Sequence, residues 1–99
     1  MGSRPEPTAI TLVVGRSIAA ADVPRLCARL AGALEAGADV VVCDLGAIAR
    51  PDLRTLDALA RLQLTARRCG GRMRLRHCSP ELGALLAFAG LAEELPVED

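Results

Sequence analysis

Four cysteines and a single histidine are the residues best able to support metal or thiol chemistry. They are Cys27, Cys43, Cys69, Cys78 and His77. A structural zinc site usually draws on cysteine pairs two to four residues apart, and this sequence has no such pair. The adjacent His77–Cys78 pair would point to opposite faces if it lay on a strand. We therefore expect four reduced, structural thiols, no metal, and no cysteine–histidine nucleophile.

The other polar residues show no arrangement that is typical of an enzyme. The sequence has no Ser–His–Asp pattern, no paired carboxylates in the context of a pocket and no cofactor fingerprint. Phe88 is the only aromatic residue and the formal net charge is zero, so neither base stacking nor a basic field favours nucleic acid. The sequence predicts a non-enzymatic protein that uses no cofactor and does not bind nucleic acid.

Charged side chains gather instead around one apolar residue, and this cluster is the candidate for partner binding. Its members are Arg50, Asp52, Leu53, Arg54, Asp57 and Arg61. Arginine is enriched at protein interfaces, and an exposed leucine within a charged rim can anchor a partner. The alternative is an ordinary solvated helix face, since Asp57 and Arg61 have the spacing of a helical ion pair. An anion at the same place is opposed by Asp52 and by the lack of a Gly-rich phosphate loop.

A strand, a short loop and a helix must position this cluster. The apolar, β-branched run 39–45 predicts a buried strand, and 46–51 predicts a turn. Asp52 stands at the N-cap position of the next helix, where capping is its main expected role. From residue 53 the period becomes helical, and we expect one buried stripe, made of Leu53, Leu56, Ala60 and Leu64.

The remaining chain continues the alternation of strand and helix. Residues 9–14 predict the first strand, and a helix follows that Asp22 caps and that Gly37 ends. Residues 72–78 alternate strictly, which predicts a strand with arginines on one face and a sheet that is open there or near an edge. Residues 79–90 predict a last helix, with inward side chains at Leu82, Leu85, Leu86, Phe88 and Ala89.

This order, βαβαβα, predicts an α/β fold with a small, mainly parallel sheet and right-handed crossovers. We expect a mobile tail at 1–8, one domain at 9–99 and a short, acidic extended tail from residue 91. No apolar run reaches the length of a membrane span, and 1–7 is polar, so we expect a soluble, cytoplasmic protein.

The order and spacing of these segments resemble a STAS domain, the module of anti-sigma factor antagonists and of sulphate-transporter tails. The matching stretches are VVCDLGAIARPDLRTLDAL and CGGRMRLRHCSPELGALLAFAGL. The resemblance covers about residues 10–97. The sequence departs from the family pattern in two places. Family members usually have a strand before the one predicted at 9–14, and they often have a further helix at the C-terminal end.

The phosphorylation motif of the antagonists is altered in this sequence. Their helix opens with Asp-Ser-Ser-Gly or Asp-Thr-Ala-Gly, and the aligned residues here are Asp52, Leu53, Arg54 and Thr55. Leu53 occupies the phosphoacceptor position and carries no hydroxyl, so that the phosphate switch is lost. Thr55 is the nearest substitute and a weak candidate.

The resemblance implies a protein-interaction module that docks an anti-sigma factor or a kinase-like regulator. The alternative is an accessory or ligand-sensing subunit of a transport system, whose partner would be a transport ATPase. A homodimer is left open, and direct membrane insertion is not expected.

Overall fold

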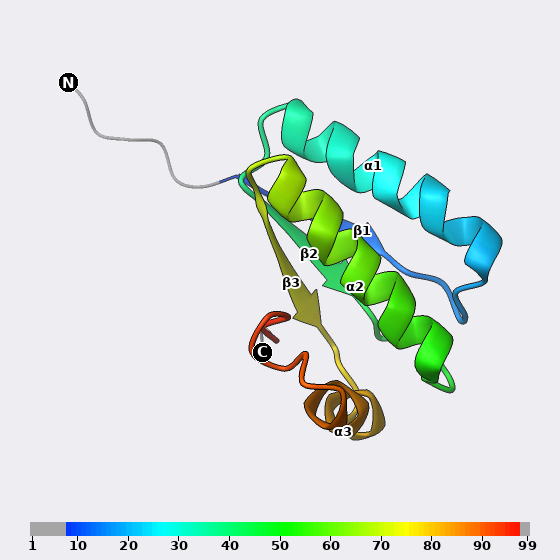
Figure 1. Cartoon of the computed structure of the whole chain (residues 1–99). Coiled ribbons are helices and arrows are strands. Elements are labelled where there is room, and N and C mark those ends of the chain that lie inside the picture. The colour runs from blue at the N-terminus through cyan, green and yellow to red at the C-terminus, as the bar shows by residue number, and fades with distance from the viewer. Residues whose placement is uncertain (1–7, 98–99) are drawn as a thin grey trace.

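The computed structural model describes residues 8–97, and within them strands and helices alternate as predicted (Figure 1). The elements are β1 (Ala9–Val13), the 3₁₀ turn η1 (Ala20–Asp22), α1 (Val23–Glu35), β2 (Val40–Asp44), α2 (Leu53–Arg68), β3 (Arg72–Arg76) and α3 (Pro80–Phe88). The three strands form one parallel sheet in the order β1-β2-β3. The predicted α/β fold with βαβαβα order is confirmed.

One face of the sheet carries the core. The parallel register places Leu12, Cys43 and Leu75 side by side across the three strands, and all three are buried. Helices α1 and α2 lie next to each other over this face (Figure 1). Both helices connect parallel neighbours, and the right-handed rule for such crossovers places them on the same side. As a consequence, both helices begin at the edge where the strands end.

Among residues 8–97, no layer of helices lies against the opposite face of the sheet (Figure 1). Thr11, Val13, Arg72 and Arg74 belong to this face and are exposed, while Val42 is buried between its neighbours on the central strand. Three arginines on one face of β3 predicted either a sheet open on one side or a strand near an edge, and both hold, because β3 is also the last strand of the sheet. The strand itself is shorter than predicted and ends at Arg76.

The buried stripe of α2 differs from the predicted one. Leu53 and Leu64 are 76% and 48% exposed, whereas the helix faces the core through Leu56, Leu59, Leu62 and Ala66. The apolar arc of this helix is wider than one stripe, and two stripes share Leu56. Packing of the helix against the sheet selects the stripe that contains Leu59 and Leu62, and it leaves Leu53 and Leu64 on the flank.

The start of α1 also differs from the prediction. The Asp22 side chain does not cap this helix; its carboxylate accepts a hydrogen bond from the backbone N–H of Ala19, at 2.9 Å. It thereby closes η1, the 3₁₀ turn that leads into the helix. A turn of this kind before the helix was not predicted, and it brings Ala19 and Ala20 close to the helix start.

The last helix and the C-terminal segment correct two further predictions. Leu82 and Leu86 of α3 are buried as expected, but Ala89 is exposed and Phe88 is 92% exposed. The segment after α3 turns before it extends, and it then bridges Leu75 at Val97. It covers the outer edge of β3. Residues 98–99, the end of the predicted acidic tail, and 1–7 of the predicted mobile tail lie outside the described residues.

Candidate functional site

The first turn of α2 is held by a reciprocal cap. The Asp52 carboxylate accepts from the backbone N–H groups of Arg54 and Thr55, at 3.0 and 3.1 Å. The Thr55 hydroxyl accepts from the backbone N–H of Asp52 at 3.2 Å. These bonds satisfy donors that the helix itself leaves without partners. Asp52 therefore has the capping role predicted for it, and its carboxylate is engaged along the helix start.

Leu53 and Thr55, which the resemblance aligned with the phosphorylation motif of the antagonists, lie in opposite environments. Leu53 projects from the cap and is 76% exposed. Thr55 is 4% exposed, and its hydroxyl is held by Asp52. A kinase needs a hydroxyl that it can reach, so the burial of Thr55 weakens its candidacy further.

Leu53 and Arg54 border a groove that leads to the start of α1. The groove has a volume of about 280 Å³ and is completed by Asp57 of α2 and by Ile18, Ala19, Ala20 and Val23. Its walls are largely apolar. The exposed Leu53 is thus one side of a concave surface that extends to the neighbouring helix.

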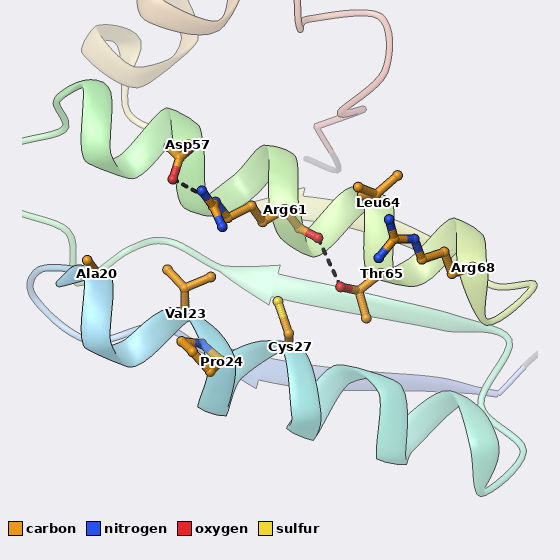
Figure 2. Close-up of a pocket in the computed structure, with 9 residues that line it drawn as sticks. All are labelled: Ala20, Val23, Pro24, Cys27, Asp57, Arg61, Leu64, Thr65 and Arg68. Atoms are coloured by element: carbon orange, nitrogen blue, oxygen red, sulfur yellow. Dashed lines mark hydrogen bonds and ion pairs between the residues drawn. The ribbon is translucent and has the colours of Figure 1, made fainter.

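A second groove, of about 490 Å³, continues along the same two helices (Figure 2). Its lining residues are Ala20, Val23, Pro24, Cys27, Asp57, Arg61, Leu64, Thr65 and Arg68. Arg61 Nε donates to Asp57 Oδ2 at 2.9 Å, as the spacing predicted, and the Thr65 hydroxyl donates to the carbonyl of Arg61 at 3.0 Å. Ala20, Val23 and Asp57 line both grooves, so the two adjoin along the same pair of helices; together they are here called the α1–α2 groove.

The structure brings most of the predicted partner-binding residues together. Leu53, Arg54, Asp57 and Arg61 line the groove, whereas Arg50 is exposed in the loop before α2 and does not. Sequence reasoning missed the contribution of α1 and of the distal part of α2, namely Val23, Cys27, Leu64 and Arg68. The parallel order of the strands could have indicated the contribution of α1. Two crossover helices between neighbouring parallel strands lie side by side, and both begin at the same edge of the sheet.

A second polar cluster lies at the carboxyl edge of the sheet. Asp44 Oδ1 accepts from the backbone N–H of Gly46 at 2.9 Å and lies 3.1 Å from His77 Nδ1. The hydrogen bond from Gly46, and then the one from His77, lowers the pKa of Asp44 below its usual 3.8. His77 has a positive φ of 57° and does not continue the row of Met73 and Leu75, which corrects the predicted alternation. The contacts tie two loop starts together.

The cysteines are dispersed in the structure. Within residues 8–97 no group of three or more histidine, cysteine or acidic side chains could hold a metal, and the four cysteines form no disulfide. Burial raises the pKa of Cys43 from 9.0 to about 12, which keeps this thiol protonated and unreactive. Among the same residues, no helix is both long and apolar enough to span a bilayer.

The comparisons with known proteins agree with the fold. The chain is similar in structure to the protein TM1081, solved by NMR, with a TM-score of 0.76 at 13% identity; the match covers 92% of this chain and 74% of that chain. At this identity the likeness shows the fold alone. No curated protein matches the sequence. Residues 1–97 match the family described as "Mlab, STAS domain". The chain therefore belongs to the STAS domain family.

Proposed function

We propose that this STAS domain is a non-enzymatic protein-interaction module that docks a partner protein through the start of α2. The observation that carries the proposal is Leu53, which is 76% exposed at the position where the antagonists of this family carry their phosphoacceptor. Exposed leucines are common, but this one borders a groove and lies beside the exposed Arg54. Arginine is enriched in binding hot spots, and the apolar Leu53 beside it supplies surface that docking would remove from water.

The proposed docking differs from that of the antagonists in its regulation. In that mechanism a phosphate of about −2 charge at the helix start disrupts the partner contact. Leu53 cannot accept a phosphate, and Thr55 is buried and hydrogen-bonded. The surface is then permanently competent to bind, and the partner is an anti-sigma factor or a kinase-like regulator that is controlled by the amount of this protein.

The second candidate function is an accessory subunit of a transport system, with a transport ATPase as its partner. The lack of a reachable hydroxyl at Leu53 and Thr55 favours this candidate as well, because a constitutive subunit needs no phosphate switch. Both candidates use the same surface. Identification of the captured partner separates them, since an anti-sigma or kinase-like protein supports the first and an ATPase the second.

Arg54→Glu tests the docking surface. Arg54 is exposed in the first turn of α2, where an acidic residue is mildly favourable, by about 0.3–1 kcal/mol, so the fold should persist. At an interface the same charge reversal costs several kcal/mol. We expect the tagged variant to keep its circular dichroism spectrum and to lose the partner that the wild-type chain retains from native lysate.

The control is Arg25→Glu, which makes the same charge change on an exposed position of α1 outside the groove. Equal loss in both variants would attribute binding to bulk charge. Undiminished binding by Arg54→Glu would contradict the proposed surface and move the interface elsewhere, for example to the open face of the sheet.

A further inference from the structure

We propose that the whole α1–α2 groove is a receptor for one acidic amphipathic helix that the partner protein contributes. This inference rests on the proposed function and extends it, because it names the chemistry of the partner segment and carries the contact beyond the start of α2. The observations behind it are the shape of the groove, the difference between its two walls and the repeat of its charges.

The groove follows α2 along nearly its full length. Its lining runs from Leu53, the first residue of the helix, to Arg68, the last. At 1.5 Å per residue these 16 residues span about 24 Å. A partner helix of four turns would match this length.

The two walls of the groove differ in character. The wall formed by η1 and α1 is uncharged and presents Ala20, Val23, Pro24 and Cys27. The α2 wall supplies Leu53 and Leu64, which are 76% and 48% exposed, and all the charges. An occupant with one apolar face would bury the apolar side chains of both walls. It would meet charged side chains only along the α2 wall.

The charges of the α2 wall repeat every seven residues. Arg54, Arg61 and Arg68 lie two turns apart along one line of the helix, and Asp57 is the one acidic residue among them. Asp57 is already paired with Arg61. Three arginines against one aspartate favour carboxylates at matching heptad positions of an occupant, and charge complementarity of this kind selects among partners.

A helix fits this surface better than an extended peptide or a second copy of the chain. Both walls are helices whose backbone groups bond internally, so an added strand would find no edge to pair with. A second copy docked through the same groove would bring the arginines of its own α2 toward these arginines. An acidic helix meets the apolar wall and the arginine line together.

Two designed peptides test the proposal on the purified full-length protein. Each is a helical 16-residue peptide with leucines repeating every three and four residues, and the two differ only in carrying glutamate or lysine beside the leucine stripe. We expect the glutamate peptide to bind at least tenfold more tightly by fluorescence anisotropy. It should also slow alkylation of Cys27, in the groove, without slowing that of Cys78, at the start of α3.

Arg68→Glu and Arg67→Glu form a matched pair of variants. Both residues are exposed, are adjacent in the last turn of α2 and undergo the same charge change, but only Arg68 lines the groove. We expect Arg68→Glu to weaken the glutamate peptide about tenfold and Arg67→Glu to leave it within twofold. Equal affinity for the two peptides, failure of both to bind, unprotected Cys27, or equal effects of the two variants would overturn the proposal.

Retention of the natural partner by the variants tests this inference separately from the proposed function. If Arg54→Glu loses the partner while Arg68→Glu and Leu64→Arg retain it, docking at the start of α2 stands and the extended groove is wrong. If Arg54→Glu also retains the partner, both are wrong. Loss in all three variants, with retention by Arg67→Glu, supports both.

Discussion

Two neighbouring residues of β2 lie on opposite faces of the sheet, and their side chains have opposite surroundings. Cys43 faces the helices, is fully buried, and has its pKa raised to about 12 by burial. Asp44, the next residue, belongs to the row of Val13 and Arg76 on the open face, and hydrogen bonds from Gly46 and His77 lower its pKa. The main influence on the side-chain pKa is therefore desolvation at Cys43 and hydrogen bonding at Asp44, one residue later.

The comparison shows what covering one face achieves. The two helices that bury Cys43 also create the α1–α2 groove between them, so the concave surface is a by-product of core formation. The open face carries exposed arginines as well, at Arg72 and Arg74, but in the residues that the structure describes no second layer lies against them. Arg72 and Arg74 border a hollow of their own, of about 260 Å³, together with Glu94 and Pro96. The apolar wall that a second helix supplies therefore distinguishes the candidate site, and positive charge does not.

The largest effect should appear in thiol reactivity. At pH 8 a pKa of about 12 leaves a thiolate fraction roughly a thousandfold below that of a thiol at the ordinary value of 9.0. We expect iodoacetamide to modify native Cys43 about a thousandfold more slowly than Cys43 in urea, as followed by peptide mass spectrometry. A native rate near that of Cys78 would mean that the covered face admits solvent.

Two neighbouring substitutions on β1 compare the faces directly. Leu12 faces the helices and is only 4% exposed, whereas Val13 lies on the open face and is 61% exposed. Leu12→Ala should lower the free energy of unfolding by about 2–5 kcal/mol, because it leaves a cavity. Val13→Ala should change it by less than about 0.5 kcal/mol. Urea denaturation measures both, and a large loss for Val13→Ala would show that the open face is covered in solution.

The cap of α2 determines how firmly the groove wall is held. Asp52→Ala removes the acceptor for two backbone N–H groups and should cost about 1 kcal/mol. Asp57→Ala is the control, because its ion pair with Arg61 is exposed and should contribute less than about 0.5 kcal/mol. Thermal unfolding compares the two variants. Equal small losses would indicate that packing of Leu56 and Leu59 alone holds the helix.

The smallest effect concerns pH and the open edge. Asp44 has a folded pKa below its unfolded value of 3.8, so its contribution to stability is present above that value and is lost as the pH falls through the folded pKa. Carboxyl NMR titration should place Asp44 below 3.8, and His77→Ala should move it upward. An unchanged titration in that variant would assign the shift to Gly46 alone.

The local pattern of the sequence was sufficient for the elements and their order. Three features of consecutive residues appear in the structure as predicted: period two at 72–76, period 3.6 after residue 53, and the cap Asp52. Asp22 shows the limit of such reasoning. Its type and position suit a cap, but a local 3₁₀ turn competes for the same carboxylate.

Four of the six predicted partner-binding residues lie along the groove, whereas the residues of its other wall cannot be found from the local pattern around α2. The groove needs Val23 and Cys27, which lie some thirty residues earlier in the sequence and reach α2 only because both helices cross the same face of the sheet. That arrangement depends on non-local pairing of strands. The hand of the crossovers then places the two helices side by side.

The order of strands and helices follows from local patterns in the sequence, and so does the identity of the strand that bears arginines on one face. Packing between elements sets which leucines of α2 are buried, that Phe88 faces outward, and that Thr55 lies beneath its cap. The physical reason is that hydrophobic burial has no direction of its own. A helix with more apolar residues than it can bury against a three-stranded sheet leaves some of them exposed. The neighbouring elements decide which ones.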